Sequence, residues 1–144
     1  MKRFLFALFA LALATLPARA GGDVGYPPDT FAIASASGNV ANGAAIATLI
    51  APAGHRAYIC GLSVMGAGAT AAITVLATVT GTMGGGLSYN YSVDTAVGVV
   101  RPPLQLYFNP CLPAATAGTN IVVTLPALGA GNTNASATAW GFVQ

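Results

Sequence analysis

The sequence predicts an all-β protein, a jelly-roll-like antiparallel β-sandwich of about eight strands with little helix. Turn-forming clusters of Gly, Pro, Asn and Ser recur about every ten residues from residue 31 onward, which is typical of a sandwich or barrel. The segments between these clusters alternate apolar and polar residues with a period of two. Alanine is abundant and favours helix, but the spacing of Gly, Pro and Thr leaves no long helical stretch.

Apolar or Thr-rich runs mark the expected strands. They cover residues 31–35, 44–51, 56–65, 71–80, 87–93, 97–101, 104–109, 120–125 and 135–143. The prolines at 102 and 103 are expected to stop the short run 97–101, and residues 110–119 are expected to form a loop. The glycine clusters at 66–68 and 84–86 are expected to be tight turns, because the Lys and the following helix of a phosphate-binding loop are missing.

Alternation also predicts which side chains face the core. Three of the expected strands have a clearly apolar face. These faces consist of Ile73, Val75, Ala77 and Val79 in the first strand, Leu104, Leu106 and Phe108 in the second, and Ile121, Val123 and Leu125 in the third. The run 56–65 is apolar on both faces, with Tyr58, Cys60, Leu62 and Val64 on one of them, so it is expected to be central or covered by a second subunit. The larger core side chains are expected to be Trp140, Phe108, Phe142 and Tyr58.

The start of the chain is expected to be a secretory signal peptide, residues 1–20. Lys2 and Arg3 precede an apolar stretch at 4–16, and Pro17-Ala18-Arg19-Ala20 supplies a cleavage site after Ala20. The apolar stretch is shorter than the roughly 20 residues that span a bilayer, so no membrane anchor is expected. Residues 21–30 are expected to be an extended N-terminal segment, and 31–144 a single domain. The predicted location is extracellular, at a cell surface or on a virion, or in the periplasm.

The two cysteines fit an exported protein. Cys60 and Cys111 are the only pair, and exported chains are exposed to oxidising conditions. We therefore expect a disulfide between them. A metal site is not expected, because no second Cys or His lies close to either residue.

Residues 21–144 carry very few charges. An ordinary domain has about a quarter of its residues charged, whereas only 6% of this chain is charged. After residue 20 the charged side chains are Asp23, Asp29, Arg56, Asp94 and Arg101. Nucleic-acid binding is not expected, because it needs clustered Lys and Arg. Weak charge repulsion instead favours contact with other copies of the chain or with other structural subunits.

Catalytic constellations are poorly represented. His55 is the only histidine, and with Asp94 and Ser63 or Ser88 it can be drawn as a triad. No G-x-S-x-G turn supports that drawing, and His55 follows Gly54 in an expected turn. A glycosidase needs two facing carboxylates, and Asp94 is the only one after residue 30. We therefore expect no enzyme activity, no cofactor and no metal.

Tyr89 and Tyr91 are the candidate ligand or interface residues. They lie two residues apart and so share one face of an expected strand, where their rings can stack on a sugar or fill a subunit interface. The alternative is a purely structural role, in which both are half-buried tyrosines of an ordinary strand.

Three segments resemble a known group of proteins: SGNVANG at 37–43, AYICG at 57–61 and LGAGNTNA at 128–135. They are similar to the small Ala/Gly/Thr-rich β-sandwich proteins of tailed bacteriophages, prophages and their hosts. The resemblance implies a role at a virion surface, whereas the signal peptide departs from it and suits a host-encoded relative. The predicted function is a non-enzymatic, self-associating subunit of a virion (decoration, fibre or tail) or of an extracellular bacterial assembly. The alternative is a secreted carbohydrate- or receptor-binding module.

Overall fold

A computed structural model describes residues 29–144 of the chain, and these residues form eight β-strands. The predicted signal peptide, and the predicted N-terminal segment up to residue 28, lie outside the described residues. The strands are β1 (Phe31–Ala36), β2 (Ala45–Leu49), β3 (Ala57–Gly66), β4 (Ile73–Thr82), β5 (Gly85–Val93), β6 (Leu104–Pro113), β7 (Ile121–Leu125) and β8 (Ala135–Val143). Within residues 29–144, no helix has the length and apolar character needed to cross a membrane.

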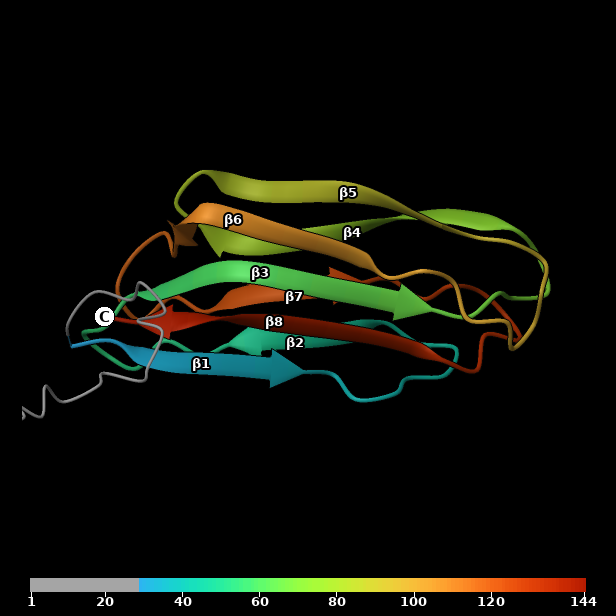
Figure 1. Ribbon diagram of the computed structural model, residues 1–144, viewed down its shortest axis with the longest axis horizontal. Coiled ribbons are helices and arrows are strands. Elements are labelled where there is room, and N and C mark those ends of the chain that lie inside the picture. The colour runs from blue at the N-terminus through green and yellow to red at the C-terminus, as the bar shows by residue number, and fades with distance from the viewer. Residues whose placement is uncertain (1–28) are drawn as a thin grey trace, which may run out of the picture.

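The strands form two four-stranded antiparallel sheets that lie face to face (Figure 1). Sheet A has the order β1-β8-β3-β6, and sheet B has the order β2-β7-β4-β5. The pairs β1 with β8, β2 with β7, β3 with β6 and β4 with β5 nest inside one another around the β4–β5 hairpin. The all-β antiparallel sandwich confirms the predicted fold class, and the jelly-roll detail stays a prediction.

The core lies between the two sheets and consists mainly of Ala, Val, Ile and Leu. The predicted inner faces of β4 and β7 are confirmed, because Ala77, Val79, Ile121, Val123 and Leu125 are at most 2% exposed. Of the four large aromatic residues expected there, Phe108 packs against the core between the sheets, and Phe142 is buried, at 6% exposure, but lies beside Tyr58. Tyr58, Trp140 and Phe142 belong to the opposite, outer face of sheet A, as described below.

Two predicted boundaries are wrong. Residues 97–101 form no strand, because Gly98 has a φ of 78° and interrupts the extended run. Val97 and Val100 make only isolated bridges to the loop after β3. The expected loop 110–119 starts later, because β6 continues to Pro113 and pairs again with the beginning of β3.

A bulge at Cys60 determines which way β3 presents its side chains. Ile59 pairs with Gly141 and Gly61 pairs with Trp140, so Cys60 is one extra residue relative to β8. An extra residue of this kind reverses the inside–outside alternation beyond it. As a result Tyr58 faces outward while Leu62 is buried, although the sequence pattern places them on one face.

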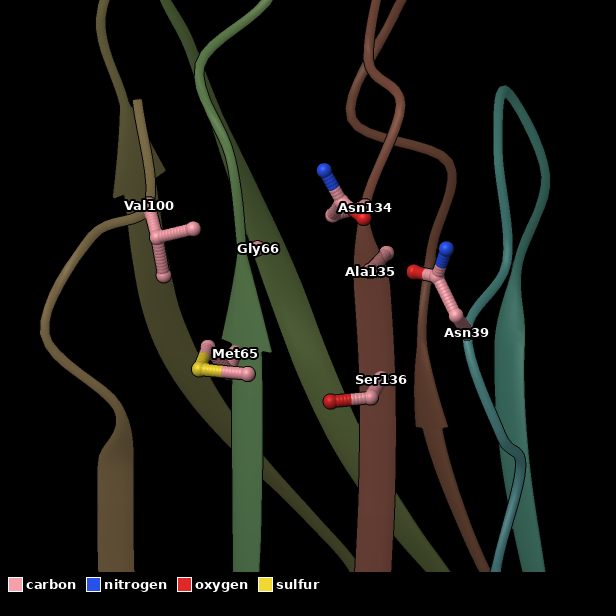
Figure 2. Close-up of a pocket in the computed structure, with 7 residues that line it drawn as sticks. All are labelled: Asn39, Met65, Gly66, Val100, Asn134, Ala135 and Ser136. Atoms are coloured by element: carbon pink, nitrogen blue, oxygen red, sulfur yellow. The ribbon is translucent and has the colours of Figure 1, made fainter. Parts of the chain in front are cut away.

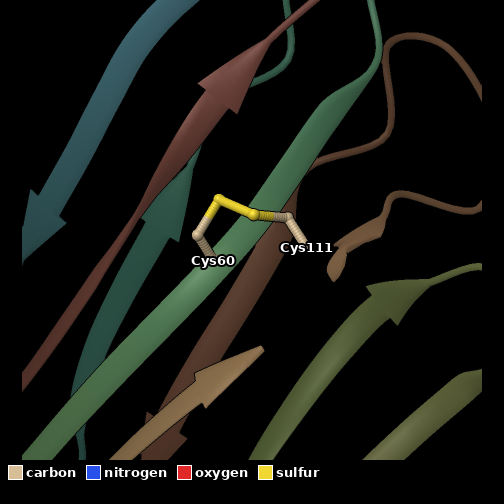
Figure 3. The surroundings of a disulfide bond; sticks show 2 residues. All are labelled: Cys60 and Cys111. Atoms are coloured by element: carbon tan, nitrogen blue, oxygen red, sulfur yellow. A yellow bond between two sulfur atoms is a disulfide. The ribbon is translucent and has the colours of Figure 1, made fainter. Parts of the chain in front are cut away.

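The predicted disulfide joins β3 to β6 at this bulge (Figure 3). β3 pairs Ile59 with Leu112 and Gly61 with Tyr107, so residues 108–111 of β6 bulge out opposite the single residue Cys60. The disulfide between Cys111 and Cys60 ties this unpaired stretch of β6 to β3. The bond therefore fixes two adjacent strands where their hydrogen-bonded register is broken.

Candidate interaction face

No strand in the described part of the chain contains Asp, Glu, Lys or Arg. Arg56 immediately precedes β3, and Asp94 and Arg101 lie in the connection between β5 and β6. The Arg101 guanidinium donates a hydrogen bond to Asp94 Oδ2, so these two charges form an ion pair. The faces of both sheets are consequently uncharged.

The outer face of sheet A carries four aromatic side chains, which we call the aromatic cluster: Tyr58, Tyr107, Trp140 and Phe142. Tyr58 and Phe142 stack, with ring centroids 4.6 Å apart and ring planes 12° apart. Tyr107 and Trp140 meet edge to face, with centroids 5.6 Å apart and an interplanar angle of 60°. The rings come from β3, β6 and β8, which are adjacent strands of the sheet.

Gly61 lets the Trp140 ring lie close to the sheet. A Cβ at position 61 would lie 2.6 Å from Trp140 Cε2 and 2.8 Å from the Leu106 carbonyl oxygen. Such contacts are too short, so only glycine leaves room for the indole ring there. The position of the Trp140 ring is thus set by a missing side chain on β3.

The cluster is open to the outside at one end. Tyr107 is 72% exposed, whereas Phe142 is 6% exposed. Ala32 and Ala34 of β1 stand opposite Phe142 and Trp140, so the flanking side chains are small. An exposed ring on an uncharged face with small neighbours can bury apolar area against a partner without removing a charge from water.

The structure assigns a different position to the tyrosines that the sequence singled out. Tyr89 and Tyr91 do share one face of β5, but that face points into the sandwich. Tyr91 is 5% exposed, and its hydroxyl oxygen accepts a hydrogen bond from the Gly66 N–H at 2.8 Å. Burial raises the pKa of the Tyr91 hydroxyl above its ordinary value. Tyr91 therefore joins the two sheets. Among the aromatic rings of residues 29–144, the exposed ones are Phe31, at 69%, and Tyr107 of the aromatic cluster, at 72%.

The residues of the conceivable triad are far apart. His55 is exposed in the connection between β2 and β3, whereas Asp94 follows β5 at the other end of the sandwich (Figure 1). Asp94 pairs with Arg101 rather than with a histidine. The geometry therefore does not bring His55, Asp94 and a serine together.

A hollow of about 410 Å³ opens where β3 ends and β8 begins. We call it the amide hollow, and it is lined by Asn39, Met65, Gly66, Val100, Asn134, Ala135 and Ser136. Figure 2 shows Val100 on one side and Asn39 on the other, with Met65 and Ser136 between them. Its lining combines two amides and a hydroxyl with two apolar side chains, and it contains no charge.

Buried polar contacts fix the walls of the amide hollow. The fully buried Asn132 donates from Nδ2 to the carbonyl oxygens of Ala67, at 2.6 Å, and of Asn134, at 3.1 Å. These bonds tie the connection before β8 to the connection after β3. The hollow is therefore held by contacts between segments that are far apart in the sequence.

Among residues 29–144 no group of three or more His, Cys, Asp or Glu side chains is placed to hold a metal ion. Comparisons with models of protein families, with curated proteins and with solved structures find no match to this chain. The resemblance to bacteriophage and prophage β-sandwich proteins stays a prediction.

Sequence reasoning missed both surface features. The aromatic cluster combines residues from three strands, and its only sequence signal is the unbroken alternation of Ser136, Thr138, Trp140 and Phe142 along β8. The amide hollow combines parts of four segments, and the Asn-rich stretches near residues 39 and 134 are its only local signal.

Proposed function

We propose that this protein is a non-enzymatic structural subunit that associates with copies of itself. Its setting is a virion, as a decoration, fibre or tail component, or an extracellular bacterial assembly reached by export. The observation that carries this proposal is the aromatic cluster, whose rings lie on an uncharged sheet face. The cores of protein interfaces are rich in Tyr, Trp and Phe and poor in charged residues.

The absence of charge from the strands favours a second copy as the partner. Two copies can bring their sheet A faces together without burying an unpaired charge or opposing like charges. The edge strands of both sheets also lack the charged residues that commonly prevent edge-to-edge pairing. Both features lower the barrier to self-association.

Size-exclusion chromatography with light scattering tests this proposal. We expect the purified protein to be a multimer over a range of concentrations. Tyr107→Asp replaces a ring that is 72% exposed with a carboxylate. Each copy would then carry a negative charge into the shared face, and the multimer should dissociate. The matched control is Leu76→Asp on the outer face of sheet B, where Leu76 is 51% exposed.

The control should leave the multimer intact while the monomer fold is kept in both variants. A wild-type protein that stays monomeric at high concentration contradicts the proposal. Equal effects of Tyr107→Asp and Leu76→Asp contradict the assignment of the face.

Binding of a neutral glycan is a second candidate function, and a separate feature favours it. The amide hollow presents hydrogen-bonding groups beside apolar side chains, and it is independent of Tyr107. In this second candidate function the ligand-binding residues are those of the amide hollow, at the loop end of sheet A. Tyr89 and Tyr91 do not serve, because they face the interior.

A further inference from the structure

We infer that the amide hollow binds one sugar unit of a neutral glycan. This inference rests on the second candidate function above and not on self-association. The volume of the amide hollow, about 410 Å³, is in the range of small-molecule sites. The ligand class follows from the groups that line the hollow and from the strands that form its floor.

The polar groups of the hollow match the hydroxyls of a sugar. Asn39 and Asn134 use their Nδ2 groups on Thr133, at 3.4 Å to its carbonyl oxygen and 2.9 Å to its Oγ1. These contacts orient both amides, and they leave the two Oδ1 atoms as acceptors. An amide can accept and donate, and the Ser136 hydroxyl can do both, so the set can pair with neighbouring sugar hydroxyls.

The apolar groups match the carbon face of the same ring. Met65 and Val100 line the hollow beside the amides, and they are 37% and 52% exposed. A pyranose ring has C–H groups on its faces and hydroxyls around its rim, so a hollow that offers both apolar and polar side chains suits it. Gly66 and Ala135 contribute mainly backbone to the hollow, because their side-chain positions face the core: a Cβ at position 66 would meet the buried Leu128, and Ala135 is a core residue.

The charge of the site selects a neutral ligand. No charged side chain lines the hollow, and the nearby Arg101 is paired with Asp94. A carboxylate or sulfate placed there would lose water without gaining a counter-charge, which is unfavourable. The hollow should therefore discriminate against uronic acids and sulfated sugars.

The strands under the hollow disfavour an extended peptide as the ligand. Its floor belongs to β3 and β8, and each of these strands has hydrogen-bonded neighbours on both sides in the order β1-β8-β3-β6. A peptide that binds by strand addition needs a free sheet edge. Side-chain recognition of a small ring does not.

Nuclear magnetic resonance titration of the ¹⁵N-labelled protein tests the inference. The probes are neutral trisaccharides of glucose, mannose, galactose and N-acetylglucosamine, with a galacturonic acid trisaccharide as the charged comparison. At least one neutral probe should shift the side-chain NH₂ signals of Asn39 and Asn134 in a saturable way. The signals of Asn90, which lies exposed on β5, should not move.

Two variants make the result specific. Ser136→Leu fills the hollow and should weaken binding by about tenfold or more, since it removes a hydroxyl and blocks the ring. Ser92→Leu is the matched control on the outer face of sheet B and should bind normally. The titration is repeated in Tyr107→Asp, where binding should persist, so that loss of self-association and loss of sugar binding are read separately.

The inference is overturned if no neutral trisaccharide shifts the Asn39 and Asn134 signals at millimolar concentration. It is also overturned if Ser136→Leu, with its fold intact by amide chemical-shift dispersion, binds as tightly as the wild type. Equal binding of the galacturonic acid probe contradicts the assigned selectivity.

Discussion

The indole ring of Trp140 lies over Gly61 of the neighbouring strand, in the space that any side chain at position 61 would need. This contact connects a bulge in β3 to the arrangement of the aromatic cluster. The Cys60 bulge turns Gly61 outward, and the absent side chain admits the ring that Tyr107 then contacts by its edge.

Gly61→Ala should disturb the aromatic cluster. The added methyl group would meet both Trp140 and the Leu106 carbonyl, and overpacking of this kind costs about 1–3 kcal/mol of stability. Urea unfolding followed by tryptophan fluorescence measures the loss. Gly86→Ala is the control, because its Cβ would meet nothing closer than the Val79 carbonyl oxygen at 3.7 Å. Equal stability of the two variants would show that the ring is not confined by Gly61.

Removal of the disulfide by Cys60→Ser with Cys111→Ser should lower the free energy of unfolding by about 4 kcal/mol. The bond spans 51 residues of sequence, and the loop-entropy relation gives a stabilisation of this size for such a loop. Denaturant unfolding of the wild type with and without reducing agent provides the same comparison without mutation. A loss below about 1 kcal/mol would mean that the β3–β6 register holds without the bond.

Asn132→Ala should destabilise the loop end of the sandwich. It removes the donor to the Ala67 and Asn134 carbonyl oxygens, and loss of a buried partner costs about 1–3 kcal/mol. Hydrogen exchange should show faster exchange of the Ala67 amide, whose N–H donates to the Asn134 carbonyl oxygen at 2.7 Å. Asn90→Ala, an exposed change on β5, should leave stability and exchange unchanged.

Tyr91 should make stability depend on pH in the alkaline range. Burial raises its pKa above the ordinary tyrosine value of about 10, so the folded protein holds the phenolic proton more tightly than the unfolded chain does. This contribution is fully present below about pH 10 and is lost as the pH rises through the folded-state pKa. Tyr91→Phe removes that contribution and also leaves the Gly66 N–H without its acceptor, which costs about 1–3 kcal/mol near neutral pH.

Urea unfolding of wild type and Tyr91→Phe between pH 8 and 11 measures both effects. The difference in the free energy of unfolding between wild type and Tyr91→Phe should narrow as the pH rises. A gap that stays constant over this range would contradict the assigned role of the buried hydroxyl.

Much of the fold follows from local pattern. Residues 135–143 were expected as a strand from their alternation, and β8 has these bounds. The inner faces of β4 and β7 follow from the same alternation, because a side chain points to the same side as its second neighbour along a regular strand. The pairing of Cys60 with Cys111 follows from there being only two cysteines.

The candidate sites do not follow from local pattern. Tyr58 was expected in the core with Leu62, and the bulge at Cys60 places it outside, because one extra residue reverses the alternation. Tyr89 and Tyr91 were expected to be able to serve a surface, and the sandwich places their shared face inward, because β5 pairs with β4 in the register that buries it.

The amino-acid sequence by itself determined that this chain folds as an antiparallel sandwich with few charges and one disulfide, since alternation, turn residues, composition and cysteine number can be read without the tertiary structure. Only the tertiary structure decided which aromatic rings face outward and which amides surround a common hollow. These depend on register between strands that are about a hundred residues apart in the chain, such as β1 and β8.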